Sequence, residues 1–542
     1  MHIHLISLVI SYFAALALTA NVTEWRSRSI YQIITDRFAL TDGSTTASCD
    51  PALGKYCGGT WAGISNNLDY IQNMGFDAIW ISPVTAQVEN MTKDLQSYHG
   101  YWQTNLYELN PHFGTAADLR ILSKELHARD MYLMVDIVVN DMAFVGAQDN
   151  VVYSTLKPFD NEEYYHSPCF VDDPGNITNV EECWLGDDIV ALPDLRTEDK
   201  NVAQGLYEWI SELVSNYSID GLRIDSAANV NPGFWSDFND AAGVFGVGEI
   251  YDTNYSTLCK YQDILTSVLN YPTYLPMTMA FNATNGSMSD LTQSVLNVKS
   301  HCRDSTLMGT FSENHDVPRF ASYTSDMTLA KNIITFTILS DGIPIIYQGQ
   351  EQHTTGRYNP VNRAALWLSK YNVTSELYEH ITALNNIRSH AFAHSDNYAI
   401  YKAYPLYNDS ETIVLRKGFD GQALLTVLTN QGEDGDKHKI MIDGTGYSSN
   451  QVIIEVLTCT NFTTENNGSL EVTVQDGAPM VFYPAEELDG YSSCQGNYTK
   501  ASSDGQTQGA HHHKGEGNVK MAWSLGGYIW WFAASLLVLT WL

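Results

Sequence analysis

Three acidic residues each end a short apolar run: Asp225 in GLRIDS, Glu249 in GVGEIYD and Asp316 in GTFSENHD. An apolar run that stops at a carboxylate is typical of a buried parallel strand, and (β/α)8 enzymes keep their chemistry at the C-terminal ends of such strands. A single such carboxylate would be interpreted as a helix cap. Two of these runs also carry Arg223 or His315, which capping does not need, so the trio predicts catalytic carboxylates.

Paired carboxyl groups indicate a particular reaction. A retaining glycosidase uses two of them about 5–5.5 Å apart, one ionised to attack the anomeric carbon and one protonated to assist the leaving oxygen. Arg223 lies two residues before Asp225, hence on the same face of the strand. We expect its positive charge to hold the pKa of the Asp225 carboxyl down.

The elements around these residues have the pattern of βα units. Strand-like apolar runs alternate with amphipathic stretches, and between two of the runs apolar residues recur at helical spacing. The pattern predicts an α/β fold, a (β/α)8 TIM barrel. The helical positions are Leu206, Ile210, Leu213, Val214 and Tyr217, and the expected strands are 78–82, 132–139, 221–224, 246–249, 307–311 and 343–347.

Changes in sequence texture divide the chain further. The barrel is assigned to residues 21–140 and 196–400, and the polar stretch 141–195, too long for a simple loop, to a subdomain inserted after the third strand. Alternating segments predict a C-terminal antiparallel β-sandwich domain over 401–494, followed by a disordered spacer at 495–520.

Length and charge limit the class of partner. The 542 residues, 44% apolar, suffice for a barrel and a smaller domain. The net charge of −33 argues against nucleic acid and anionic lipid, which would be repelled, whereas a neutral polymer is indifferent to it. Aromatic residues, 12% of the chain, suit stacking on sugars, although core packing explains most of them. A monomer is expected.

Both ends of the chain predict export. Residues 1–20 resemble a secretory signal peptide, and twelve Asn-x-Ser/Thr sites fit a glycoprotein. Residues 521–542 form an uncharged apolar tail after the polar spacer. A transmembrane tail anchor is one interpretation. A glycosylphosphatidylinositol (GPI) addition signal is preferred, which places the protein on the extracellular face of the plasma membrane and in the cell wall, with a lipid as its only membrane contact.

The eight cysteines predict disulfides. No CxxC motif occurs and the histidines lack zinc-site spacing, so sequence-local pairs in an oxidising compartment are the economical interpretation. The pairs are Cys49 with Cys57, Cys169 with Cys183, Cys259 with Cys302, and Cys459 with Cys494.

Four motifs carry a family resemblance. VDIVVND, GLRIDS, GEIYD and FSENHD resemble, in order and spacing, the four sequence regions of the α-amylase family, glycoside hydrolase family 13. Segments such as DRFALTDGSTTASC and DGIPIIYQGQEQH extend the likeness to secreted fungal α-amylases over about residues 23–494.

The resemblance implies roles. Asp225 would be the nucleophile, Glu249 the acid and base, and Asp316 the residue that distorts the donor sugar. It implies α-1,4-glucan (starch, maltooligosaccharides or cell-wall α-glucan) as substrate and Ca²⁺ as a structural ion held by oxygen ligands. The implied substrate residues are His99, Tyr101, Trp102, Arg223, His315 and Arg363, and the implied calcium ligands are Asn140, Glu181, Asp194 and the carbonyl of Asn229.

Some positions depart from the family. Asp141 stands where the first region usually has His, Ala228 and Asn229 replace a Lys-His pair, and Asn359 replaces an Asp. Fungal GPI-anchored relatives with a changed first-region His are implicated as 4-α-glucanotransferases of cell-wall α-glucan, so transfer is predicted to be favoured over hydrolysis. The alternatives are a plain hydrolytic α-amylase acting on starch and a non-catalytic glucan-binding wall protein.

Overall fold

A computed structural model describes residues 22–395 and 397–494, all within one compact unit. The predicted signal peptide at 1–20, the spacer at 495–520 and the apolar tail at 521–542 lie outside the described residues. Within the described ranges, no helix combines the length and apolar character needed to cross a bilayer.

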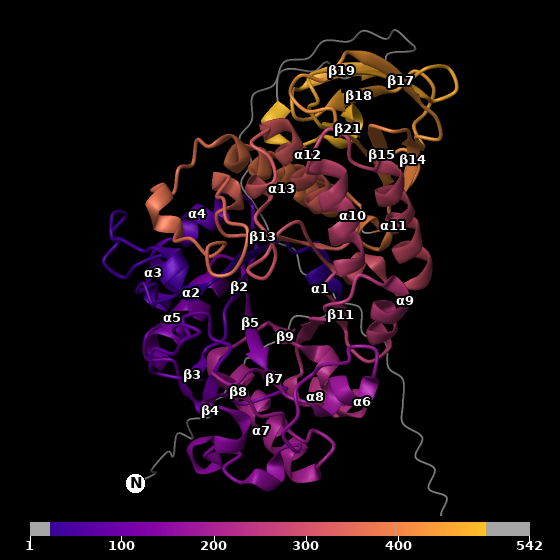
Figure 1. Cartoon of the computed structure of the whole chain (residues 1–542). Helices are drawn as coiled ribbons and strands as arrows, with labels where there is room; N and C mark the ends of the chain where they lie inside the picture. The colour runs from indigo at the N-terminus through magenta and orange to yellow at the C-terminus, as the bar shows by residue number, and fades with distance from the viewer. Residues whose placement is uncertain (1–21, 396, 495–542) are drawn as a thin grey trace, which may run out of the picture. The chain divides into compact units, whose positions relative to one another are not determined.

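Eight parallel strands form the central sheet, in the order β11-β10-β9-β5-β2-β1-β13-β12 (Figure 1). Leu269, next to β11, and Gly309, the first residue of β12, form a parallel bridge that closes the sheet into a barrel. The predicted TIM barrel is therefore confirmed. The strands are β1 (Ile30–Ile33), β2 (Ala78–Ile81), β5 (Tyr132–Val138), β9 (Gly221–Asp225), β10 (Phe245–Gly248), β11 (Ser267–Val268), β12 (Gly309–Phe311) and β13 (Ile343–Tyr347).

Five of the six expected strands differ from the structure by one or two residues at an end, and two of these shifts concern the strands that precede Glu249 and Asp316. The expected strand at 307–311 begins only at Gly309, because the side chain of Asp304 accepts the N–H of Thr306 and starts a 3-10 turn over Ser305–Leu307. Strand β10 runs from Phe245 to Gly248, so Glu249 follows the strand rather than ending it. Both shifts leave the carboxylates beyond the C-terminal ends of their strands.

Helix α7 (Lys200–Tyr217) has the predicted apolar face. Asp199 accepts the N–H groups of Asn201 and Val202 and so caps the helix, which ends at Ser218 in a left-handed conformation. Four of the five residues predicted to form that face are buried, and Tyr217 is half-buried. The other helices are α1 (Val22–Ser27), α2 (Thr35–Phe38), α3 (Trp61–Asn66), α4 (Leu68–Gln72), α5 (Ala116–His127), α6 (Ile177–Glu182), α8 (Trp235–Ala242), α9 (Tyr255–Leu258), α10 (Tyr271–Phe281), α11 (Met288–His301), α12 (Met327–Leu339) and α13 (Glu376–His394).

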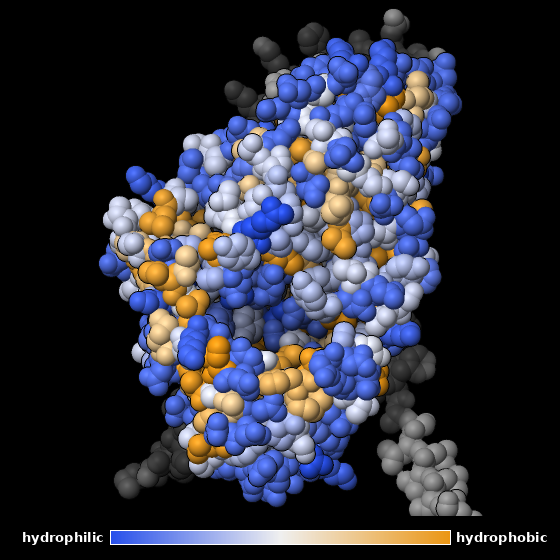
Figure 2. Space-filling view, viewed as in Figure 1, coloured by the Kyte–Doolittle hydropathy of each residue, from blue (hydrophilic) through white to orange (hydrophobic). Residues whose placement is uncertain are grey.

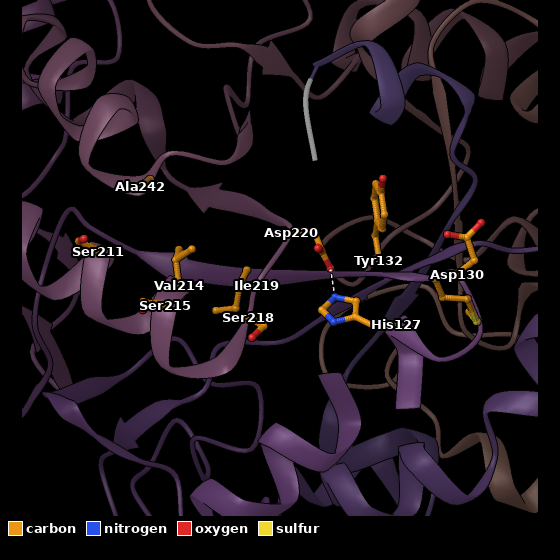
Figure 3. Close-up of a pocket in the computed structure, with 11 residues that line it drawn as sticks. His127, Asp130, Tyr132, Ser211, Val214, Ser215, Ser218, Ile219, Asp220 and Ala242 are labelled. Atoms are coloured by element: carbon orange, nitrogen blue, oxygen red, sulfur yellow. Dashed lines mark hydrogen bonds and ion pairs between the residues drawn. The ribbon is translucent and has the colours of Figure 1, made fainter. Parts of the chain in front are cut away.

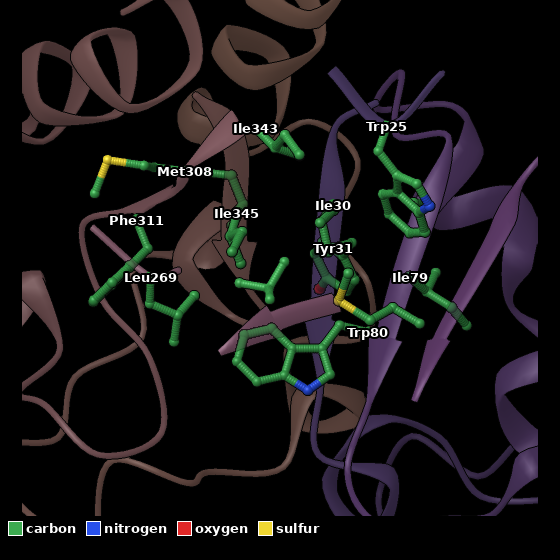
Figure 4. Close-up of a cluster of buried hydrophobic side chains, with 14 of the residues drawn as sticks. Trp25, Ile30, Tyr31, Ile79, Trp80, Leu269, Met308, Phe311, Ile343 and Ile345 are labelled. Carbon is green, nitrogen blue, oxygen red and sulfur yellow. The ribbon is translucent and has the colours of Figure 1, made fainter. Parts of the chain in front are cut away.

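The barrel core consists of aliphatic and aromatic side chains from its strands, with Trp25 of α1 beside them (Figure 4). The Trp25 indole stacks on Phe245, with ring centroids 5.1 Å apart, and donates its N–H to the carbonyl of Asp220. Gly221 permits this close approach, because a Cβ there would lie 2.6 Å from the indole. We therefore expect any side chain at this position to displace Trp25.

Shorter sheets flank the barrel. After β5 the chain forms a small antiparallel sheet in the order β6-β8-β7, and helix α6. Residues after α13 form a six-stranded antiparallel sheet and a two-stranded sheet that share an apolar cluster, as a β-sandwich does. The strands are β3 (Thr85–Gln87), β4 (Gln103–Leu109), β6 (Phe144–Val145), β7 (Leu185–Gly186), β8 (Val190–Leu192), β14 (Tyr404–Asn408), β15 (Thr412–Lys417), β16 (Leu424–Thr429), β17 (His438–Ile442), β18 (Val452–Glu455), β19 (Thr460–Thr463), β20 (Leu470–Val474) and β21 (Met480–Pro484).

The cysteines form the four predicted disulfides, and the described residues include no free cysteine. The pairs Cys49–Cys57 and Cys169–Cys183 close short loops, whereas Cys259–Cys302 and Cys459–Cys494 are separated by 43 and 35 residues. The prediction of four sequence-local bridges is confirmed.

Candidate active site

One buried guanidinium holds the first two predicted carboxylates. Arg223 Nη1 lies 2.6 Å from Asp225 Oδ1, and Nη2 lies 2.8 Å from Glu249 Oε2. The two carboxylates come from the ends of the neighbouring strands β9 and β10, so they occupy the two branches of one fork. A hollow lined by hydrophilic residues is visible at the place where Figure 1 labels β5 and β9 (Figure 2).

A third carboxylate bonds the same guanidinium. Asp136 of β5 is buried, and its Oδ1 lies 3.0 Å from Arg223 Nη1. Its Oδ2 accepts the hydroxyl of Tyr101 at 2.6 Å and the indole N–H of Trp80 at 3.1 Å. Asp136 is not among the residues predicted from the sequence. Its signal was a charged residue inside the apolar run VDIVV, which is costly to bury unless it is paired.

The surroundings of Asp225 shift the pKa of its carboxyl in opposite directions. Desolvation raises the pKa of Asp225 to about 8; Arg223 acts in the opposite direction, while Glu249 and Asp136 add to the rise. Arg223 therefore lowers this pKa, as predicted, but one cation does not offset the burial of a carboxyl that also has two other acids beside it. Burial likewise raises the pKa of Asp136 to about 6.

Two neutral donors orient Glu249. Its Oε1 accepts the hydroxyl of Tyr271, the first residue of α10, and its Oε2 accepts the backbone N–H of Ser226, each at 3.2 Å. Ser226 adopts a left-handed conformation with φ of 47°, which turns the chain sharply after Asp225. Its hydroxyl donates to Asp225 Oδ2 at 3.0 Å. Sequence patterns did not predict either donor, because both act through tertiary placement.

His315 and Tyr101 form one wall of the site. The amide of Gln32 donates to His315 Nδ1 at 2.7 Å, which places the imidazole proton on Nε2, 2.8 Å from the Tyr101 hydroxyl. His99 Nδ1 accepts the backbone N–H of Tyr101 at 3.0 Å. Burial lowers the pKa of both His99 and His315 well below the usual range, so both are neutral.

Asp316 lies at the more open edge of the site. Its carboxylate contacts Arg363 Nη2 and His315 Nε2, each at 3.1 Å. The side chain is 32% exposed, compared with 17% for Asp225 and 9% for Glu249. The trio thus combines two enclosed carboxylates with a third that is more accessible.

Trp102 lies beside this network rather than within it. Its ring contacts His99 edge-on, 4.8 Å between centroids, and packs against a small apolar cluster that includes Val88 and Val190. His99, Trp102 and Asn359 line a cleft of about 420 Å³. The structure thus places this predicted substrate residue in an adjoining cleft.

Asp141 occupies a buried position near the nucleophile. Burial and the charge of Asp225 raise its pKa well above the usual range, and one of its oxygens, Oδ1, is buried without a hydrogen-bond partner in the described chain. Its backbone forms a bridge with Asp194. Ala228 and Asn229 lie in the short 3-10 turn (Ala227–Asn229) after Ser226.

The predicted calcium ligands come together in two pairs. Asn140 and Asp194 meet where Asn140 O accepts the N–H of Leu195, and Asn229 Nδ2 donates to the carbonyl of Val180, next to Glu181. Asp194 Oδ1 is buried without a hydrogen-bond partner in the described chain, and a carboxylate oxygen of this kind fits a hard cation such as Ca²⁺. Among the described residues, no three His, Cys, Asp or Glu side chains lie close enough to share a metal. The predicted calcium shell would not form such a cluster, because only two of its four ligands, Glu181 and Asp194, are carboxylates.

Comparisons with known proteins identify the family of the chain. The model of the α-amylase catalytic domain matches residues 32–472. The chain is 47% identical over 470 residues to alpha-amylase 2 of Schwanniomyces occidentalis, covering 87% of this chain and 92% of that one, and 49% identical to alpha-amylase 1 of Lipomyces kononenkoae, covering 88% and 76%. The solved structure of an alpha-amylase from Malbranchea cinnamomea matches with a TM-score of 0.86 and 49% identity, covering 88% of this chain and all of that one. The chain therefore belongs to the α-amylase family, glycoside hydrolase family 13, and is a glycosidase of the α-amylase type.

Proposed function

We propose that this enzyme cleaves α-1,4-glucosidic bonds with retention and passes the glycosyl unit preferentially to another α-glucan. The Arg223 fork, which holds Asp225 and Glu249 side by side, is the observation that carries the retaining mechanism. An Asp225 oxygen attacks C1 while the C1–O4 bond breaks and Glu249 gives its proton to the departing O4. A 4-hydroxyl or water then attacks C1 and returns a proton to Glu249, and the bond to Asp225 breaks.

The neighbouring residues supply position and charge. Arg223 compensates the carboxylate that forms when Glu249 gives up its proton, and Tyr271 keeps the Glu249 carboxyl oriented during both steps. Asp316, held by Arg363 and His315, stands where it can bond the hydroxyls of a distorted donor sugar. His99 and Tyr101 complete the wall of that subsite.

Transfer is favoured by features on the acceptor side. Tyr251 follows Glu249 by two residues, is 69% exposed, and its ring lies 4.8 Å from that of Tyr271, which bonds the acid. An exposed ring offers an incoming sugar a stacking surface, whereas water gains nothing from it. The replacements at Asp141, Ala228 and Asn229 change the surroundings of the trio while leaving all three carboxylates in place.

Product analysis on maltopentaose tests this proposal. We expect oligomers longer than the substrate early in the reaction, with a yield that rises with substrate concentration, because a sugar acceptor competes with water for the intermediate. Glucose and maltose without longer products at every concentration would leave a plain hydrolytic α-amylase. Absence of any turnover would leave a glucan-binding protein.

We further propose that Ca²⁺ is held by Asn140, Glu181, Asp194 and the Asn229 carbonyl, fastening the residues between β5 and α7 to the barrel. The buried, unpartnered oxygen of Asp194 supports this. Calcium bound only by the folded state stabilises it by mass action. Chelation should therefore lower the melting temperature, and added Ca²⁺ should restore it; Asp194→Asn should weaken that response.

The proposed location is the cell surface, by way of the secretory pathway and a GPI lipid. The apolar tail at 521–542 and the polar spacer before it support this. Phosphatidylinositol-specific phospholipase C should release the enzyme from membranes, and a chain truncated before residue 521 should appear in the medium. Retention of the enzyme after lipase treatment would contradict the lipid anchor.

A further inference from the structure

Arg319 is a fully buried arginine outside the catalytic cluster. Its Nη1 contacts Glu313 Oε1 at 3.0 Å and the carbonyl of Gln348 at 2.7 Å, and its Nε donates to the carbonyl of Asn362 at 2.8 Å. The guanidinium also lies 3.8 Å from the centre of the Tyr347 ring. One side chain therefore joins the loop after β12, the end of β13 and the segment around residue 362.

Two of those segments carry the donor-site residues. The loop after β12 contains His315 and Asp316, and Arg363 follows Asn362 directly. The carbonyl of His315 accepts both Asn362 Nδ2 at 2.9 Å and Arg363 Nε at 3.0 Å. The distance between Asp316 and Arg363 thus depends on how these two backbone segments are held together.

Glu313 secures the other end of the same arrangement. It is buried, its Oε1 bonds Arg319, and its Oε2 accepts the backbone N–H of Phe320 at 2.6 Å. Glu313 therefore closes the loop that contains His315 and Asp316 at both ends. A buried ion pair often contributes little net stability compared with apolar residues of the same volume, so its directional contacts are its main consequence here.

We propose that Arg319, paired with Glu313, is a positioning residue that sets the geometry of Asp316 and Arg363 at the donor sugar. This inference rests on the proposed function, because it assigns Asp316 to the distorted donor. Lysine cannot replace Arg319, since a single ammonium cannot span Glu313, Gln348 and Asn362 in the fixed directions of a guanidinium. Displacing reacting groups by about 1 Å costs on the order of 100-fold in rate.

The test compares Arg319→Lys with Arg388→Lys. Arg388 is a matched control, since it is also buried but donates to main-chain carbonyls of Arg26 and Ser27, away from the donor loop. We expect Arg319→Lys to lower kcat on maltopentaose by about 10- to 100-fold. The same variant should bind acarbose, which mimics the distorted donor, more weakly, and this loss should parallel the loss in kcat/KM. Its affinity for maltotriose should change little. Arg388→Lys should lower the melting temperature without these effects.

Two further measurements make the outcome decisive. In Arg319→Gly, added guanidinium should restore part of kcat, whereas it should not rescue Glu249→Gln. Should Arg319→Lys fail to fold, Glu313→Gln provides the same kinetic comparison. An unchanged kcat with only a lower melting temperature, in whichever variant folds, would overturn the proposal. A wild-type enzyme without turnover would instead defeat the proposed function.

Discussion

The two ends of strand β9 each carry an aspartate but differ in what surrounds it. At the C-terminal end, Asp225 shares the Arg223 guanidinium with Glu249 and Asp136. Before the N-terminal end, Asp220 accepts His127 Nε2 and the backbone N–H of Leu133, both at 2.8 Å. The first arrangement concentrates several acids on one cation, whereas the second satisfies a single acid locally.

Cavity volume alone would point to the N-terminal end of β9. A cavity of about 540 Å³ lies beside Asp220, lined by Ser211, Ser215, Ser218 and apolar residues such as Val214 (Figure 3). In this view His127 reaches Asp220, and no second carboxylate joins them. Convergence of acids on a shared buried cation, rather than cavity volume, therefore distinguishes the proposed catalytic end of the barrel.

The largest expected difference between the two ends is catalytic. Glu249→Gln removes the proton donor and should lower kcat/KM by about 1,000-fold, while maltooligosaccharide binding, measured by calorimetry, remains. Asp220→Asn should leave kcat/KM nearly unchanged. Persistent turnover in Glu249→Gln would show that another residue supplies the proton.

Charge at the catalytic end should appear in the pH profile. Asp225 must be ionised to attack, and Arg223 opposes the burial that raises its pKa. Arg223→Gln should therefore move the acid limb of the kcat/KM profile to higher pH, in addition to a rate loss of roughly 100-fold. Arg223→Lys keeps the charge but loses the fork, so it should lose rate with a smaller shift. An acid limb that moves to lower pH in Arg223→Gln would contradict this assignment.

A smaller effect concerns the acceptor. Removing the exposed ring in Tyr251→Ala should reduce the ratio of transfer to hydrolysis on maltopentaose by about 3- to 10-fold, since ring stacking is worth about 1 kcal/mol. Tyr358→Ala is a matched control, because Tyr358 is similarly exposed, at 67%, but does not follow the acid. Equal product ratios in both variants would remove Tyr251 from the acceptor site.

The smallest effect is one of stability at the N-terminal end. Asp220→Asn weakens two hydrogen bonds and should cost about 1 kcal/mol in the free energy of unfolding. The hydrogen bond to Asp220 raises the pKa of His127, so this contribution is complete below the unfolded-state pKa near 6.5 and is lost as pH rises through the folded-state value. Denaturant unfolding of both proteins across that range should show the difference shrinking with pH.

The fold and the position of the three carboxylates at the C-terminal ends of the strands could be predicted from the sequence, because their signals are local. Apolar runs ending in carboxylates identified β9, β10 and the loop after β12, and the spacing of Leu206 and Ile210 identified α7. The length of the strand before Asp316 was overestimated, because the Asp304 side chain caps a 3-10 turn there, and hydropathy does not report such a cap.

The contacts that tune the site could not be obtained in this way. Tyr271 and Gln32 reach Glu249 and His315 across the barrel from distant positions in the chain. The net pKa shift of Asp225 depends on how much water is removed, which the neighbouring Arg223 in the sequence does not reveal. These contacts depend on tertiary placement and the pKa shift depends on burial, and both are properties of the folded chain.

Trapping the glycosyl intermediate tests the central claim most directly. An activated fluorinated maltosyl donor should form a covalent adduct that accumulates, and peptide mapping by mass spectrometry should place it on Asp225. Label on Asp220, Asp136 or any other residue, or on none while the donor is consumed, would contradict the assignment of Asp225 as nucleophile.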